Sequence, residues 1–263
     1  MTIRRLVRTD YELQDAADEF GISREDAARD LALLSVIASL SERFGDRIVL
    51  KGGAALRFAH GASRTSRDAD ATVTQPAGAP IPADEVISAI RNARMGQFLR
   101  INVPSAPRTD NRYSLDVDRV EFTCAGIEGT LDVELSYREE IQLEPARPTI
   151  GTPYFEPFEV RVMRPVEMAA EKLRTLYQRQ RGTDLADCVA LERLASGDLH
   201  LLPGARRAKF RLVRDGVGPN HLHERVDGLA DRYEADVRPV DPEAPDYATA
   251  RDAANRLIRA AWQ

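Results

Sequence analysis

Two carboxylates lie two residues apart in the stretch "RDADATVT", residues 67–74. The alternation and the β-branched residues near its end predict a strand, in which residues two apart share a face. Asp68 and Asp70 therefore point to the same side of that strand. Such a pair can bind a hard cation such as Mg²⁺, which also takes substrate phosphates as ligands. Alternating acids are equally typical of a solvated strand face, so this pattern alone leaves both interpretations open.

A second acidic stretch, "LDVELS" at residues 131–136, repeats the arrangement. Its apolar residues alternate with Asp132 and Glu134, which share the polar face. If this strand lies beside the first, one of the two acids adds a third carboxylate to Asp68 and Asp70. Three carboxylates can hold two Mg²⁺ ions for phosphoryl or nucleotidyl transfer. The spacing does not decide between Asp132 and Glu134.

A glycine pair, Gly52-Gly53, precedes the first acidic stretch and lies between "RIVL" and "AALRFAHG". The pattern predicts a buried strand over 47–50, a tight turn, and a helix over 54–61. Glycines in such a turn let backbone N–H groups approach a phosphate, and a helix N-terminus attracts anions. The spacing is not that of a P-loop or a dinucleotide fingerprint, so the turn is either a phosphate turn or a plain connection.

Other polar residues have two interpretations each. Arg57 is suited to a triphosphate or to a structural ion pair, and Ser66 to a phosphate hydrogen bond or to capping the turn before the strand. The basic run "ARRAKFRLVR", residues 205–214, is a candidate RNA groove or a solvated basic helix face.

The composition describes an ordinary globular protein. The chain has 263 residues, 43% of them hydrophobic, and a net charge of −5, which argues against a generally basic nucleic-acid coat protein. Two cysteines without a C-x-x-C and four scattered histidines argue against a disulfide framework or a zinc site. The N-terminus lacks a signal-peptide core, and the longest apolar run, residues 31–40, is too short to span a membrane. We therefore expect a cytoplasmic protein.

Strand patterns stop near residue 160, and helical patterns dominate after Pro165. We expect an α/β (α+β) fold, with an N-terminal domain over 1–160 that holds a mixed sheet with flanking helices, and a mostly helical domain over 161–263. The expected helices are 9–20, 24–43, 54–61, 84–96, 166–180, 184–196, 222–235 and 246–262. The expected strands are 47–50, 67–74, 113–125, 129–137 and 157–165.

The first helix after Pro165 carries a lysine at the border of its apolar stripe. On a helical wheel Lys172 adjoins that stripe, while Glu167 and Arg174 lie well off it. Lys172 can run along the core and present its ammonium in a cleft, or it can be a surface lysine on a solvated face with Glu171.

The next predicted helix carries two acids three residues apart. Asp184 and Asp187 can therefore share a face. Asp184 is also the kind of first-turn acid that the helix dipole favours.

Taken together, "LKGGAALRFAHGASRTSRDADATV" resembles the AbiEii/AbiGii toxin family of DNA polymerase β-like nucleotidyltransferases. That family is typified by Lys-Gly-Gly-Thr-x-Leu-Arg followed by Ser-Arg-Asp-x-Asp. "VELSYREE" is similar to its strand with a third acid. "EMAAEKLRTLYQRQRGTDLADCVAL" is similar to its Ala-x-Glu-Lys-Leu helix and following Asp-x-x-Asp helix. Ala54 departs from the pattern, since the family often has Thr there, and this weakens any role for a hydroxyl in the turn.

The resemblance implies a Mg²⁺-dependent nucleotidyltransferase toxin that transfers NMP from an NTP to an acceptor and so blocks translation. The leading candidate for the acceptor is the 3′ end of tRNA. It implies a phosphate-contacting lysine at Lys172, a required acid at Asp187 with Asp184 as the alternative, and a cognate antitoxin. The expected catalytic residues are Asp68, Asp70, Lys172, Asp187 and Asp184. The expected NTP-binding residues are Gly52, Gly53, Ser66, Lys172 and Arg57. The expected metal ligands are Asp68, Asp70, Glu134 and Asp132.

Four other functions are alternatives: protein nucleotidylation, a nucleotide-binding module without transfer, a phosphodiesterase or nuclease, and an interaction protein without catalysis. Intact acids at all the strand positions argue against the pure binding module. The glycine turn before the Asp-x-Asp favours binding a triphosphate over cleaving a chain.

Overall fold

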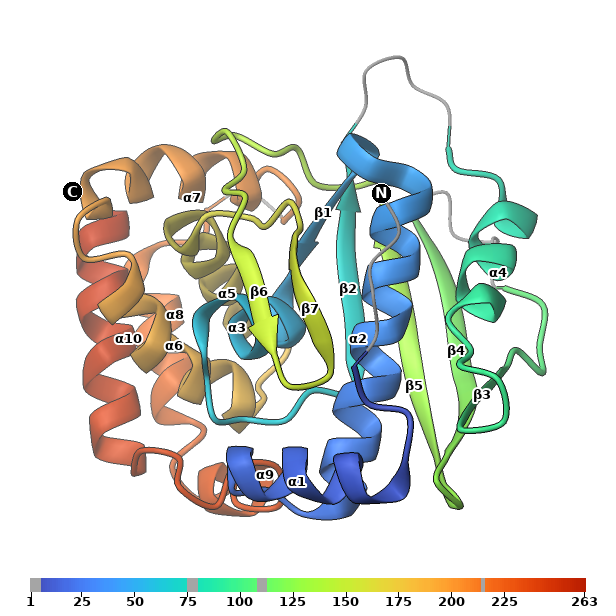
Figure 1. Cartoon of the computed structure of the whole chain (residues 1–263). Helices are drawn as coiled ribbons and strands as arrows, with labels where there is room; N and C mark the ends of the chain where they lie inside the picture. Colours follow the sequence, from blue (N-terminus) through green and yellow to red (C-terminus); the bar gives the residue numbers. More distant parts are fainter. Residues whose placement is uncertain (1–5, 75–79, 108–112, 214–215) are drawn as a thin grey trace. The chain divides into compact units, whose positions relative to one another are not determined.

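The computed structural model describes residues 6–74, 80–107, 113–213 and 216–263. The chain divides into two compact units (Figure 1). The sheet unit comprises residues 1–61, 65–138 and 147–162, and the helical unit comprises residues 62–64, 139–146 and 163–263.

The sheet unit is built on a mixed sheet with the strand order β1-β2-β5-β4-β3. Strand β2 runs parallel to β5, and the other neighbouring pairs are antiparallel. A separate antiparallel pair, β6 and β7, follows in the chain. The strands are β1 (Ile48–Lys51), β2 (Asp68–Val73), β3 (Leu99–Asn102), β4 (Ser114–Cys124), β5 (Ile127–Ser136), β6 (Thr149–Thr152) and β7 (Phe155–Glu159). The predicted α/β class with a mixed sheet and flanking helices is confirmed.

Helices cover the apolar face of this sheet. Ile37 and Leu40 of α2 line a small cavity together with Ala69 and Ala71 of β2, so α2 packs on the side that faces away from Asp68 and Asp70. Helix α4 contacts α2 and β3, and Figure 1 shows α2 beside the sheet. The helices of the sheet unit are α1 (Asp10–Phe20), α2 (Arg24–Phe44), α3 (Gly52–His60) and α4 (Ala83–Asn92).

The apolar run at residues 31–40 is explained by this position of α2. The side chains of residues 31–40 are buried, because α2 contacts the sheet on one side and the helices α1 and α4 on its other sides. Ser23 caps its first turn by accepting a hydrogen bond from the Asp26 N–H. Among the helices of the described residues, none is long and apolar enough to cross a membrane.

The helical unit packs its helices around α5, which contacts α6, α7 and α8. Helix α10 contacts the same three helices and adds to that core. The helices of this unit are α5 (Pro165–Gln178), α6 (Gly182–Leu194), α7 (Leu202–Phe210), α8 (Pro219–Asp227), α9 (Tyr233–Val237) and α10 (Tyr247–Ala261).

Several predicted elements differ from the structure, among them the helix predicted over 84–96, which ends at Asn92. The helix predicted over 222–235 is wrong, since α8 ends at Asp227 with Gly228 as its C-cap and α9 follows separately. The strand predicted over 157–165 ends at Glu159, which pairs with Thr149, the first residue of β6, and α5 begins at Pro165. Strands β3 and β6 were not predicted: each is four residues long and is held by its pairing with a neighbour.

Three charged residues of α5 are buried, contrary to the expectation from the helical wheel. Glu167 is completely buried, and Arg174 and Glu171 are 5% and 8% exposed. The Nζ atom of Lys209, on α7, lies 2.6 Å from Glu167 Oε1. Arg174 donates to Glu139 Oε1 at 2.9 Å. The charged side chains of α5 that the sequence pattern places in solvent therefore form buried ion pairs with other parts of the unit.

The same network fixes the segment 139–146 onto α5. Glu167 accepts hydrogen bonds from the backbone N–H groups of Gln142 and Leu143, at 2.9 and 3.2 Å. Lys209 donates to the carbonyl oxygen of Glu140 at 2.7 Å. Part of the basic run 205–214 is thus internal structure, and Arg214 lies outside the described residues.

We expect Lys209→Met to lower the free energy of unfolding of the helical unit by about 3–5 kcal/mol, because it leaves buried carboxylates without their cation. Fluorescence of Trp262, the single tryptophan, reports this unit, since its ring contacts Phe210 of α7. The exposed Arg207 on the same helix is the control, and Arg207→Met should change stability by less than about 0.5 kcal/mol. Equal urea midpoints for the two variants would contradict the internal role of Lys209.

Candidate active site

The two acidic strands are neighbours in the sheet. In the parallel register of β2 and β5, Asp68 lies opposite Asp132 and Asp70 lies opposite Glu134. Side chains at paired positions project from the same face and lie within reach of one another. Asp68 and Asp132 are exposed, whereas Asp70 and Glu134 are half-buried. The polar face of the sheet therefore carries the four acids as two adjacent pairs.

The glycine turn lies directly against Asp70. Gly52 has φ +68°, and a Cβ atom at this position would lie 2.5 Å from Asp70 Oδ2. Any side chain would meet the carboxylate, so glycine is required both by the backbone angle and by the close approach. Lys51, which precedes the turn, pairs with Asp70 across β1 and β2 and is only 7% exposed. The turn is thus more than a plain connection: it packs on the acid that the sequence places fifteen or more residues later.

Asp132 and Glu134 differ in what they bind. A β-bulge interrupts the pairing of β4 with β5 between Val117 and Val120, and Arg119 within it has φ 54°. The backbone N–H of Arg119 donates to Asp132 Oδ1 at 2.7 Å. Asp132 therefore stabilises the bulge, whereas Glu134 lies beside Asp70 in the row nearer the sheet centre.

Asp116 extends that inner row to a third strand, and it was missed from the sequence. It lies opposite Glu134 on β4, so Asp70, Glu134 and Asp116 occupy neighbouring positions on β2, β5 and β4. Its Oδ1 atom is buried, and no hydrogen-bond partner for it lies among the described residues. The signal was available, because "LDVD" at 115–118 alternates in the same way as "LDVEL".

Arg57 and Ser66 have local partners in the sheet unit. Arg57 donates through Nε and Nη2 to Asp30 Oδ2, at 3.1 and 2.7 Å, which is the ion-pair alternative. Burial raises the pKa of Asp30, and the Arg57 charge opposes this effect. Ser66 is buried and donates to the carbonyl oxygen of Asp68 at 3.3 Å, so its hydroxyl supports the start of β2.

Oxygen donors of the right chemistry for a divalent cation are present in the acid rows. Over the described ranges, no three His, Cys, Asp or Glu side chains converge as a metal cage. Mg²⁺ is usually bound through one or two carboxylates, with water and substrate phosphates as its other ligands. The Asp68 and Asp70 pair, with Glu134 opposite Asp70, fits this donor set.

The helical unit holds the other predicted site residues in one buried cluster. Lys172 Nζ lies 2.7 Å from Asp184 Oδ1 and 2.8 Å from Asp187 Oδ2. Arg64 binds Asp187 with two hydrogen bonds, at 3.0 and 3.2 Å, and Arg179 binds Asp184 at 3.0 Å. Both acids of the Asp-x-x-Asp helix therefore hold the same ammonium. Arg64 was not predicted, since nothing in the spacing links it to a helix more than a hundred residues later.

Charge in this cluster keeps the acids ionised. Burial opposes ionisation of Asp184, but Lys172 and Arg179 outweigh it and lower the pKa of Asp184 to about 2. Burial also opposes ionisation of Asp187, yet Lys172 and Arg64 lower its pKa below the usual value. For Lys172, burial favours the neutral amine, and the two aspartates reverse this and raise its pKa.

We expect the stability of the helical unit to fall as pH drops from about 4 toward 2. A carboxyl whose folded pKa is depressed contributes stability that is present above its unfolded pKa and is lost as pH falls through its folded pKa. Asp184→Asn should remove part of this dependence and lower stability at pH 6 by about 3 kcal/mol. Urea unfolding followed by Trp262 fluorescence tests both effects. The exposed Asp252→Asn is the control, and the same acid profile in Asp184→Asn as in wild type would refute the assignment.

Comparison with known proteins identifies the family. A family model described as "Nucleotidyl transferase AbiEii toxin, Type IV TA system" matches residues 37–262. The chain belongs to the AbiEii family. It is therefore a nucleotidyltransferase and a toxin of a toxin–antitoxin system, and the family implies an NTP substrate and a cognate antitoxin. A search of the curated proteins found no match.

Solved structures share the fold of this AbiEii chain. One is MenT4, a nucleotidyltransferase toxin from Mycobacterium tuberculosis, with a TM-score of 0.67 and 21% identity over 98% of this chain and 90% of that one. Another is JHP933 from Helicobacter pylori, with a TM-score of 0.52 and 16% identity over 90% of this chain and 91% of that one. The predicted family is confirmed, and the three stretches that carry the resemblance lie within the matched residues.

Proposed function

We propose that this AbiEii enzyme transfers NMP from an NTP to the 3′ end of tRNA in the cytoplasm, with Mg²⁺, and so blocks translation. One observation supports this proposal most: the glycine turn packs on Asp70, which lies opposite Glu134. This arrangement combines a backbone suited to phosphates with carboxylates suited to a divalent cation.

Asp68, Asp70 and Glu134 would hold Mg²⁺ in this proposal. When bound, the ion supplies positive charge that offsets the charge on the triphosphate and favours the ionised acceptor hydroxyl. In this proposal Asp132 stabilises the β-bulge instead of binding the metal, because its Oδ1 accepts a hydrogen bond from the Arg119 N–H. Asp116 lies on the far side of Glu134 and supports the row.

The chain itself positions the triphosphate. The Gly52-Gly53 turn opens α3, whose first N–H groups have no partner within the helix and carry partial positive charge. In the reaction the acceptor hydroxyl oxygen bonds to the α-phosphorus, and the bond from that phosphorus to the bridging oxygen breaks. Pyrophosphate leaves, and the hydroxyl proton passes to water.

Lys172 is the proposed phosphate ligand of the helical unit, on the strength of the family motif. Asp184 and Asp187 hold its ammonium, and their depressed pKa values keep that support charged at neutral pH. Ser66 and Arg57 are proposed as supports of the turn and of the strand rather than as direct phosphate ligands.

Incubation with Mg²⁺, each labelled NTP in turn and unfractionated tRNA tests the proposal. Label on tRNA that disappears in Asp68→Ala and Asp70→Ala supports it. Label on protein instead would make a protein the acceptor. Tight NTP binding without any transfer would favour a binding module, and RNA shortening without NTP would favour a nuclease.

A further inference from the structure

The basic surface that the sequence suggests, residues 205–214, is partly used inside the helical unit. Lys209 is 1% exposed within an ion pair, and the Arg206 guanidinium lies 4.5 Å from the centre of the Trp262 ring. Fewer of its cations are therefore available to RNA than the run suggests.

A second basic segment lies in the sheet unit. Residues 86–109 contain four arginines and no aspartate or glutamate, in a chain whose net charge is −5. Arg91 and Arg94 lie at and just after the end of α4, and Arg100 lies on β3. All three are exposed, while Arg108 lies outside the described residues. A local excess of arginine is the usual electrostatic footprint of a nucleic-acid contact.

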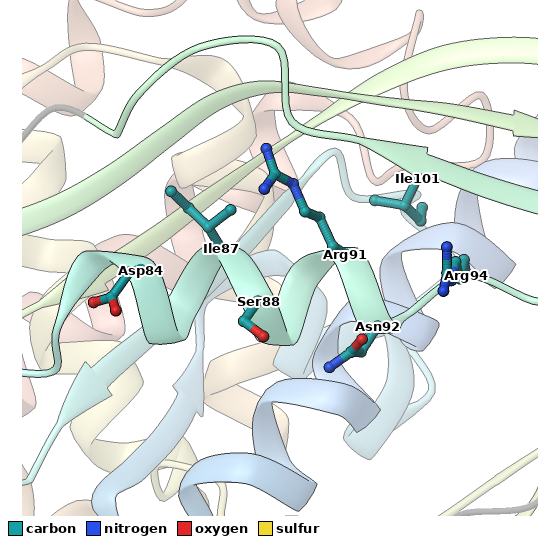
Figure 2. A pocket seen from close by; sticks show the side chains of 7 residues that line it. All are labelled: Asp84, Ile87, Ser88, Arg91, Asn92, Arg94 and Ile101. Atoms are coloured by element: carbon teal, nitrogen blue, oxygen red, sulfur yellow. The ribbon is translucent and has the colours of Figure 1, made fainter.

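Two of these arginines line a pocket of about 480 Å³ between α4 and β3 (Figure 2). Within the described part of the chain, neither Arg91 nor Arg94 forms a hydrogen bond or an ion pair. In Figure 2 Ile87 and Arg91 project from one side of α4, and Ser88 and Asn92 from another. The remaining lining residues are Asp84, at the opposite end of the helix, and Ile101.

The helix dipole explains only part of this arrangement. A cation in the last turn of α4 is favoured by the helix C-terminus, which accounts for Arg91. Arg94 lies beyond the helix, where no such effect operates. Arg100 does not line the pocket, because it neighbours Ile101 in β3 and therefore projects from the opposite face of the sheet. Arg91 and Arg94 line the pocket without an ion pair to Asp84 or to another acid of the described residues, and an anionic ligand would balance their charge.

We propose that this arginine pocket, defined by Arg91 and Arg94 with Ser88 and Asn92, binds backbone phosphates of the RNA acceptor. The inference rests on the proposed function for its choice of RNA. A guanidinium group can donate two parallel hydrogen bonds to the oxygens of one phosphate. The Ser88 hydroxyl and the Asn92 amide add neutral hydrogen-bond donors. Ile87 and Ile101 supply the apolar wall on which a ribose or base can pack.

The pocket is separate from the acid rows. Ile101 pairs with Phe122 on the face that α4 covers, whereas Asp70 and Glu134 project from the opposite face of the sheet. Loss of the pocket should therefore weaken RNA binding without changing the chemistry at the acids. The appropriate readout is RNA affinity and its dependence on salt, rather than turnover alone.

The test uses full-length protein carrying Asp70→Asn, without NTP, and fluorescently labelled unfractionated tRNA. Anisotropy titrations between 50 and 300 mM salt (roughly the range over which phosphate contacts are resolved) compare this protein with the same protein carrying Arg91→Gln and Arg94→Gln. We expect roughly tenfold weaker binding and a salt slope lower by about 1 to 2. The control pair, Arg193→Gln with Arg259→Gln, makes the same charge change at exposed arginines of the helical unit and should have little effect.

Equal losses in the test and control pairs would overturn the proposal, because net charge would then explain the effect. Unchanged binding in the test pair, or no tRNA binding by the parent, would overturn it as well. A parallel transfer assay on wild-type protein separates failure of the proposed function from failure of this surface.

Discussion

Asp70→Asn is expected to lower nucleotidyl transfer by at least about 10³-fold while leaving the far-UV circular dichroism spectrum unchanged. The substitution keeps the shape of the side chain and removes its charge. Asp70 is the acid that meets the glycine turn on one side and Glu134 on the other, so its charge acts at the centre of the proposed site. Steady-state rates with saturating NTP and tRNA measure the effect.

A matched pair on β5 sharpens this prediction. Glu134→Gln should lower transfer by more than about 10²-fold, because its carboxylate lies beside Asp70. Asp132→Asn should cost less than about tenfold, because asparagine keeps the oxygen that accepts the Arg119 N–H. A larger loss at Asp132 than at Glu134 would reverse the assignment of the third carboxylate.

Gly52→Ala is expected to lower kcat/KM by about 10²-fold and stability by about 1–2 kcal/mol. The stability cost comes from a side chain at φ +68°. The activity cost comes from the methyl group, which would lie 2.5 Å from Asp70 Oδ2 and must displace that carboxylate. Transfer rates and thermal unfolding of the same preparations separate the two contributions.

Gly61, at the other end of α3, provides the control. It also has φ +68°, but a Cβ atom there would meet nothing within 4 Å. Gly61→Ala should therefore show a similar loss of stability and nearly full activity. If both variants lose activity equally, the contact between Gly52 and Asp70 has no catalytic consequence.

Much of the fold was readable from local patterns. The alternation in residues 67–74 and 129–137 predicts both acidic strands, and the family motif places them in one enzyme. Their adjacency is confirmed by the pairing of Asp70 with Glu134. Periodicity also located α2, α5 and α6 to within two residues at each end.

Other features depend on tertiary contacts that no local pattern records. The burial of Glu167 follows from Lys209, which arrives from a helix some forty residues later. Arg64 and Asp187 are far apart in the sequence and come into contact only in the folded chain. Strand β3 is held by its pairing with β4. The proposal of Glu134 rather than Asp132 as the third carboxylate rests on the bulge at Arg119, which the alternation does not reveal. The roles proposed for Lys172, Asp184 and Asp187 in catalysis stay predictions.

The most direct test of the central claim follows the two ends of the triphosphate separately. Wild-type protein is incubated with tRNA and NTP carrying a radioactive label at either the α- or the γ-phosphorus. Nucleotidyl transfer predicts α-label on the tRNA, γ-label in released pyrophosphate, and loss of both signals in Asp70→Asn. Gamma-label on the tRNA, or α-label on tRNA that survives in Asp70→Asn, would contradict the proposed role of this acid site.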